Sequence, residues 1–258
     1  MELIQEEEGL SILKNLIREE QDSLGLKRSV WTKLGVVGEF QIYKVYEYNH
    51  EELNALLYNV GLLPLVTYIK SDDLTEDELG RVAHIPAQSK RYLRFTPTNT
   101  FKQHRNIALF AKMEEVSVLD KVAMWKECNN KFERLNTKWQ REKLRALVSP
   151  EFKKSKRLTF ECGTFSVLDG PKKYRTDMVL ELFDEKTMFK YAKVNFDRMD
   201  EIRARGFLKN HELNDVRKVV DVQRRYILLS IQKEKVKKDY WYSKLERLSK
   251  LSQGLGDG

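Results

Sequence analysis

The segment from Ser89 to Arg105 combines the residue types that bind nucleic acid. Cations neutralise phosphates, hydroxyl and amide side chains donate further hydrogen bonds, and aromatic faces stack on unpaired bases. All three kinds occur here, the cations being Lys90, Arg91, Arg94, Lys102 and Arg105 and the aromatic residues Tyr92, Phe95 and Phe101. We therefore expect this segment to contact DNA or RNA. The alternatives are a solvated strand and loop with inward aromatic residues, or a surface that docks on an acidic part of the chain.

A second basic stretch lies in a long helix that we expect over residues 115–148. Its second half is rich in cations, and the three that we assign to nucleic-acid binding are Lys138, Arg141 and Arg145. Four further cations follow the helix, namely Lys153, Lys154, Lys156 and Arg157. Such a helix face could follow a phosphate backbone, whereas the alternative is that its charges only keep the helix solvated.

Two residues farther along the chain suggest metal-assisted catalysis as an alternative to binding. Asp177 stands at the start of an expected strand, and Lys193 stands on the next one. This layout resembles the core of nucleases related to restriction endonucleases, in which two carboxylates hold Mg²⁺ and a lysine positions the attacking water. Tyr191 stands where the second carboxylate of that pattern belongs, so Glu161 or Glu181 would have to replace it. The resemblance implies a metal-dependent nuclease, active or degenerate, with Asp177 and Lys193 as catalytic candidates.

No cofactor and no metal site is expected from the remaining motifs. The four histidines and the two cysteines, Cys128 and Cys162, do not stand at metal-ligand spacing. A glycine-rich phosphate loop, a nucleophile elbow and a dinucleotide fingerprint are all missing from the sequence. These observations favour a non-enzymatic protein over an enzyme.

The charges are divided unevenly along the chain. Residues 1–78 hold 7 Lys and Arg against 16 Asp and Glu, a balance of −9, and the remaining 180 residues hold 40 against 23, a balance of +17. Residues 79–113 hold seven Lys and Arg but no Asp or Glu. An acidic head on a basic body predicts a polyanionic partner, or two parts of the chain that face each other.

The elements that position these residues follow from hydrophobic period and capping signals. Leucines at helical spacing predict an amphipathic helix over residues 2–21. Residues 30–48 read as a β-hairpin with its turn at Gly38. Asn49 and Thr75 are each followed three residues later by Glu, so both are expected to begin helices.

The second half of the chain is expected to hold a sheet and another long helix. Alternating residues predict a small antiparallel meander over 157–194, including strands at 178–183 and 188–194. Residues 210–251 lack Gly and Pro and carry an irregular apolar stripe, which predicts one long helix. That helix could break near residues 237–239, and coiled-coil pairing is an alternative.

Together these patterns predict an α+β fold that is mainly helical, with an N-terminal β-hairpin and a small C-terminal antiparallel sheet flanked by two long helices. We expect an acidic α+β part over residues 1–112, ending in the basic loop, and a basic part over 113–258. The expected function is non-enzymatic nucleic-acid binding. The alternative is a protein-interaction or assembly module, in which residues 211–251 bind a protein partner or a second copy.

The N-terminal residues and the hydropathy of the chain indicate the cellular compartment that we expect for this protein. The first eight residues are acidic and lack the basic and apolar regions of a signal peptide. No stretch reaches the ~18 consecutive apolar residues of a membrane span. We therefore expect a cytoplasmic, intracellular protein without a membrane partner.

Overall fold

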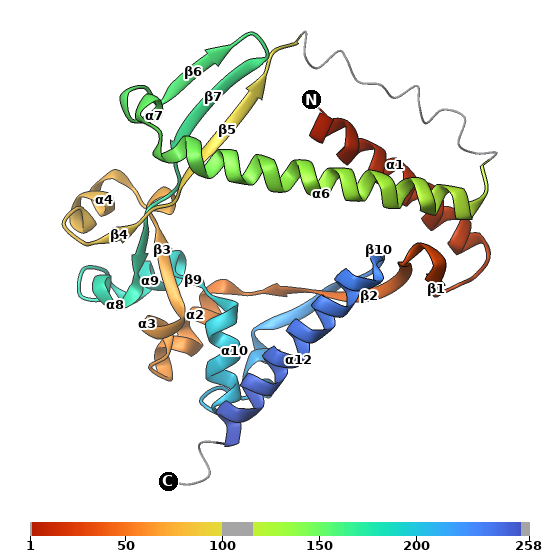
Figure 1. Ribbon diagram of the computed structural model, residues 1–258. Coiled ribbons are helices and arrows are strands. Elements are labelled where there is room, and N and C mark those ends of the chain that lie inside the picture. The colour runs from red at the N-terminus through yellow and green to blue at the C-terminus, as the bar shows by residue number, and fades with distance from the viewer. Residues whose placement is uncertain (1, 100–115, 254–258) are drawn as a thin grey trace. The chain divides into compact units, whose positions relative to one another are not determined.

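A computed structural model describes residues 2–99 and 116–253 of the chain (Figure 1). The chain divides into two compact units, each assembled from three separate segments. Unit 1 comprises Met1–Ile42, Arg91–Leu168 and Arg224–Lys238, and unit 2 comprises Tyr43–Lys90, Asp169–Gln223 and Asp239–Gly258. The boundary expected between residues 112 and 113 lies outside the described residues, so it stays a prediction.

The fold is α+β with antiparallel sheets and long helices, as the sequence predicts. Unit 1 holds two long helices, a hairpin and a three-stranded sheet. Its elements are α1 (Glu2–Ser23), β1 (Arg28–Trp31), the 3₁₀ turn Thr32–Leu34, the start of β2 (Val36–Tyr48), β5 (Arg91–Pro97), α6 (Val118–Val148), α7 (Pro150–Lys154), β6 (Arg157–Phe160), β7 (Gly163–Asp169), the end of β10 (Arg217–Ser230) and the start of α12 (Ile231–Gln253).

The first core of unit 1 lies between its two long helices and its hairpin. Leu13 and Ile17 of α1 are fully buried against Val122 and Trp125 of α6, which confirms the expected inward stripe of the first helix. Figure 1 shows α1 running beside α6. Burying a leucine or isoleucine side chain is worth about 1.5–3 kcal/mol, so the burial of Leu13 and Ile17 stabilises the packing of α1 on α6.

The hairpin forms, but its turn differs from the prediction. β1 and β2 pair in antiparallel register through the 3₁₀ turn, and Gly35 takes the positive φ of 63° that closes it. Gly38 instead lies inside β2, opposite Ser29. Its role is steric, because a Cβ at this position would lie 2.1 Å from the hydroxyl oxygen of Tyr226.

Unit 2 packs short helices around a four-stranded antiparallel sheet of order β4-β8-β3-β9. Its elements are the end of β2, α2 (His50–Asn59), α3 (Leu63–Val66), β3 (Thr67–Lys70), the 3₁₀ turn Ser71–Asp73, α4 (Glu76–Val82), β4 (Ala87–Gln88), β8 (Lys173–Arg175), α8 (Thr176–Val179), α9 (Glu185–Tyr191), β9 (Lys193–Val194), α10 (Phe196–Ala204), α11 (Asn210–Asp215), the start of β10 and the end of α12. Both predicted caps are confirmed: the Asn49 side chain accepts from the Glu52 amide, and Thr75 forms a capping box with Glu78.

The expected strands at 178–183 and 188–194 are wrong over most of their length. Residues 176–179 form the short helix α8, and Glu185–Tyr191 forms α9. Asp184 caps α9, because its carboxylate accepts a hydrogen bond from the Thr187 amide. Only Lys193 and Val194 are extended, as β9. Apolar runs of this length fit a buried helix as well as a strand, and here helix capping prevails.

The expected helix over 210–251 is also wrong in its first half. Asn210–Asp215 forms the separate short helix α11, and Arg217–Ser230 forms the long strand β10, which follows β2 in the sheet β1-β2-β10. The long helix covers only Ile231–Gln253. Tyr226 and Leu228 are buried, as strand alternation requires. The β-branched and aromatic residues of this segment suit a strand, and the lack of Gly and Pro does not distinguish the two structures.

None of the helices in the described ranges combines the length and the apolarity needed to cross a membrane.

Candidate nucleic-acid interface

The predicted binding segment contributes the edge strand of a three-stranded sheet in unit 1. The strand order is β5-β7-β6, and β6 and β7 pair with Arg157 opposite Ser166 and Thr159 opposite Thr164. Two backbone bonds bracket the pairing of β5 with β7: the Gly170 amide donates to the Lys90 carbonyl (2.9 Å), and the Thr98 amide donates to the Cys162 carbonyl (3.2 Å). This antiparallel register places Arg94 opposite Ser166 and Thr96 opposite Thr164.

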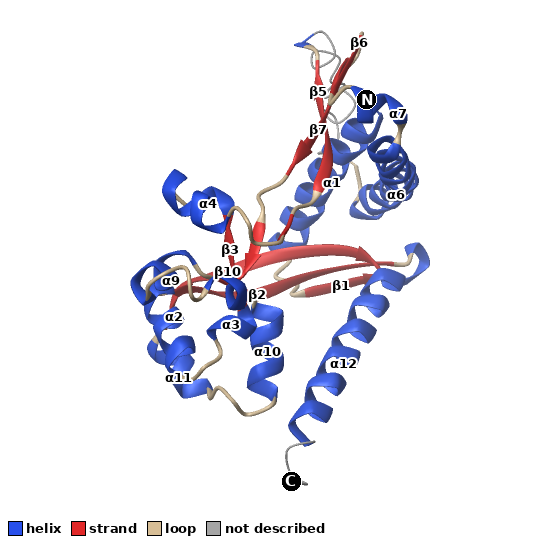
Figure 2. Cartoon of the chain, turned by 90° about the vertical axis from the view of Figure 1, so that its left-hand side faces the viewer, coloured by secondary structure: helices blue, strands red, loops and turns tan. Residues whose placement is uncertain are grey.

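One face of this sheet is a core face. It packs on α6 and α7 through a small cluster whose members are Leu93, Phe95, Trp139, Ala146, Leu147, Phe152, Leu158, Phe165 and Val167. The Phe95 and Phe165 rings are 4.6 Å apart between centroids, and Trp139 lies 6.0 Å from Phe165. Figure 2 shows α6 and α7 on one side of the three strands. Phe95 is therefore a packing residue, as the alternative interpretation of the segment proposed.

The opposite face of the sheet is open, and we call it the open face. Because successive residues of a strand point to opposite sides, it is formed by Tyr92, Arg94, Thr96, Arg157, Thr159, Thr164, Ser166 and Leu168. These side chains lie in rows across the strands. The central row is Arg94, Ser166 and Arg157, and the next row is Thr96, Thr164 and Thr159. The hydroxyl oxygens of Thr159 and Thr164 are 3.3 Å apart.

The open face is positively charged. Its two arginines stand on the two outer strands, about 10 Å apart at the backbone, since neighbouring strands are spaced by ~4.8 Å. Both are exposed, and no carboxylate in the described ranges forms an ion pair with either. The nearest acidic residues in the β6–β7 hairpin, Glu161 and Asp169, lie at its two ends and outside the central rows. An anion can therefore approach the middle of this face without meeting a fixed negative charge.

The predicted helix residues belong to another surface. Lys138, Arg141 and Arg145 are exposed and recur at helical spacing, on the side of α6 turned away from Trp139 and the core cluster. Arg145 also pairs with Glu142 at 3.0 Å. Because the sheet packs its inner face on α6, the helix cations and the open face point in opposite directions. The two basic stretches of the sequence thus form two surfaces.

The other predicted contacts are distributed as follows. Lys90 directly precedes β5 and is exposed. Arg91 is also exposed, but alternation places it on the side of the strand that carries Leu93. Lys102 and Arg105 lie outside the described residues, as does Phe101. The hydroxyl residues of β6 and β7 were missed from the sequence, although Thr164 and Ser166 alternate visibly with the apolar residues of β7.

The two nuclease candidates have separate partners in unit 2. Asp177 lies in the first turn of α8 and accepts two hydrogen bonds from Arg175, one of them 3.0 Å long, which raises the pKa of Arg175. Lys193 lies on β9, with its amino nitrogen 3.6 Å from the Asp73 carboxylate. Within residues 2–99 and 116–253, no three His, Cys, Asp or Glu side chains gather in a way that could hold a metal ion.

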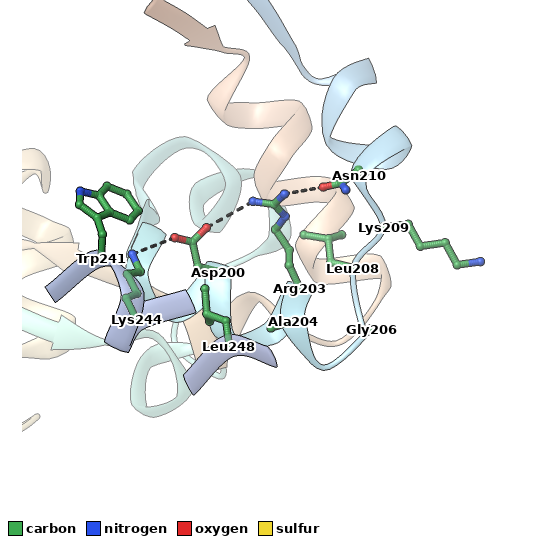
Figure 3. A pocket seen from close by; sticks show the side chains of 10 residues that line it. All are labelled: Asp200, Arg203, Ala204, Gly206, Leu208, Lys209, Asn210, Trp241, Lys244 and Leu248. Atoms are coloured by element: carbon green, nitrogen blue, oxygen red, sulfur yellow. Dashed lines mark hydrogen bonds and ion pairs between the residues drawn. The ribbon is translucent and has the colours of Figure 1, made fainter. Parts of the chain in front are cut away.

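Unit 2 also contains a pocket of about 540 Å³ that α10, α12 and the loop before α11 line (Figure 3). Its polar groups bind one another. Asp200 accepts from Lys244 (3.2 Å) and pairs with Arg203 (3.3 Å), and Arg203 also donates to Asn210. Hydrogen bonding to Asp200 and Asp197 raises the pKa of Lys244. Carboxylates neutralise Arg203 and Lys244, and the side chain of the third lining cation, Lys209, extends away from the other lining residues (Figure 3). We therefore assign this pocket no anionic ligand.

Comparison with known proteins identifies no relative. No family model, no curated protein and no solved structure matches this chain. The assignment of a function therefore depends on the residues and the geometry of the chain itself.

Proposed function

We propose that this protein binds nucleic acid without acting on it, and that the open face of the β5-β7-β6 sheet is its contact surface. The observation that carries the proposal is the central row of that face, in which Arg94 and Arg157 flank the Ser166 hydroxyl. Arginine binds phosphate through two parallel hydrogen bonds, and a serine hydroxyl between two such groups supplies a further donor.

The arrangement also supports binding on energetic grounds. Each phosphate that a cation neutralises releases condensed counterions, so the affinity falls with salt by a slope of about −0.7 per contact on a single strand and −0.9 on a duplex. Two arginines thus predict a slope of about −1.4 to −1.8. Between 50 and 200 mM salt, this corresponds to a loss of roughly tenfold in affinity.

The first prediction tests binding itself. Fluorescence anisotropy of labelled single- and double-stranded oligonucleotides should show binding at low salt, with an affinity that weakens roughly tenfold between 50 and 200 mM salt. A neutral protein of similar size is the control. If no oligonucleotide binds more tightly to this protein than to the control, the proposed function is wrong.

The second candidate function is association through α12, and one specific observation favours it. None of the 23 residues of this helix is buried, and its exposed apolar side chains include Tyr240, Trp241, Tyr242 and Leu245. Solvated helices rarely present so many large apolar side chains unless a partner covers them. The helix carries seven Lys and Arg against three Asp and Glu, so an acidic partner is favoured. The acidic helix α1 of a second copy has the required charge.

The second prediction concerns this association. Light scattering of the full chain should give the mass of a dimer, and the double variant Trp241→Ala, Leu245→Ala should give that of a monomer, since both side chains are more than half exposed. Ser243→Ala on the same helix is the control and should remain dimeric. A truncation that ends at Lys209 would not test this association, because it also removes residues of β10 that are buried in the fold. A wild-type monomer at micromolar concentration would rule out self-association.

A further inference from the structure

We infer that the open face selects single-stranded over double-stranded polynucleotide, with Tyr92 as the platform on which one unpaired base stacks. This inference rests on the proposed function and names the substrate class of the same site. The positive charge of the open face would attract any nucleic acid, whereas its exposed ring and the shape of its sheet distinguish single strands from duplexes.

The first support is the position of Tyr92. It stands two residues from Arg94 on β5, so strand alternation places both side chains on the open face, about 7 Å apart along the strand. The Tyr92 residue is 47% exposed, whereas Phe95, one residue beyond Arg94, is packed against Phe165. In such a pair, the aromatic ring can stack on the base of a nucleotide while the arginine binds its phosphate.

The second support is the width of the sheet. The major groove of a B-form duplex is about 12 Å wide and admits a helix or a two-stranded ribbon. Three strands span about 10 Å between the outer backbones alone, and the side chains of β5 and β6 extend beyond this. The inner face is also covered by α6 and α7. The sheet cannot enter the groove, so a duplex could touch the open face only through its phosphates.

The third support is the chemistry of the second row. Thr96, Thr164 and Thr159 present three hydroxyl groups, each of which can both donate and accept a hydrogen bond. Such groups can bind phosphate, sugar or base edges without demanding one base. Paired bases cover their own faces by stacking, so Tyr92 would be left without a partner on a duplex. A single strand uses the ring, the arginines and the hydroxyl row together.

The experiment measures affinities for a labelled single-stranded DNA of about 12 nucleotides, the RNA of the same sequence and the DNA duplex. The wild-type protein should bind at least one single strand about tenfold or more tighter than the duplex. Tyr92→Ala should weaken single-strand binding by roughly five- to a hundredfold, which is the range for loss of one stacked base, and should leave duplex binding within about twofold. Tyr92→Trp should retain single-strand affinity, and its indole fluorescence should be quenched on binding. Tyr242→Ala, which removes an exposed ring from α12, is the matched control.

The outcomes separate this inference from the proposed function. Equal affinities for single strands and duplex, with Tyr92→Ala weakening neither, would overturn the single-strand inference while nucleic-acid binding stands. Binding of no oligonucleotide at all would overturn both. Preference for RNA over DNA, or the reverse, is compatible with the inference and identifies the sugar that the threonine row favours. Thermal melting of the Tyr92 variants should match that of the wild type, because the side chain is half exposed.

Discussion

Reversing the charge of the two arginines of the open face is expected to abolish nucleic-acid binding. In the double variant Arg94→Glu, Arg157→Glu, the central row changes by four charge units, so both proposed arginine–phosphate contacts would be replaced by repulsion. We expect the affinity at about 50 mM salt to fall on the order of a hundredfold or more, and the salt dependence of any residual binding to flatten. Anisotropy titrations of the double variant and the wild type give both quantities.

The α6 stripe offers a matched control for that experiment. The double variant Lys138→Glu, Arg141→Glu has the same charge change, and both residues are likewise exposed. Because this side of the helix points away from the open face, we expect an affinity loss of only about threefold, arising from the altered net charge. A larger loss from the helix pair than from the sheet pair would move the interface to α6 and contradict the assignment of the open face.

Replacing Gly38 by alanine is expected to cause the largest loss of stability. Gly38 lies beside a buried network in which Tyr226 donates to the Gln21 carbonyl oxygen (2.9 Å), and the Gln21 amide donates to the carbonyls of Leu26 (3.1 Å) and Gly38 (3.3 Å). Burial raises the pKa of Tyr226, so its phenol stays a neutral donor. An added methyl group would lie 2.1 Å from the Tyr226 oxygen and 2.8 Å from the Gln21 oxygen, so this network must move.

We estimate the free energy of unfolding of unit 1 to fall by about 3 kcal/mol, from overpacking and the broken buried hydrogen bond together. Urea unfolding followed by tryptophan fluorescence measures this, since Trp31, Trp125 and Trp139 all lie in unit 1. Gly80→Ala in helix α4 should instead be neutral or slightly stabilising, because the new methyl group would meet nothing within 4 Å beyond its chain neighbours and the backbone of its own helix.

A second substitution tests the cause of the Gly38 effect. Tyr226→Phe removes the oxygen that the new methyl group would meet, so adding it to Gly38→Ala should recover part of the lost stability. In the wild-type background the same change should destabilise, because it leaves the buried Gln21 oxygen without its donor. If Gly38→Ala unfolds at the wild-type urea concentration, the close approach at this position is contradicted.

The local elements were the most predictable part of this fold. The helix α1 and the caps at Asn49 and Thr75 depend on interactions within a few residues, and all are confirmed. The turn at Gly38 and the helix over residues 217–230 were wrong, because each depends on partners far away in the chain. Gly38 is required by Tyr226, almost 190 residues later, and β10 is extended because it joins the sheet of β2.

The same division applies to the candidate site. The sequence alone shows that Tyr92, Arg94 and Thr96 alternate with Leu93 and Phe95, which predicts that the two sets lie on opposite faces of a strand, because a period of two is a property of the local backbone. Only the tertiary structure decided that Phe95 is packed and Tyr92 is open, that Arg94 faces Ser166 and Arg157, and that Lys138 belongs to another surface. The reason is that the face a strand exposes depends on what covers the other face, and here the cover is α6, which begins more than 20 residues after β5 ends.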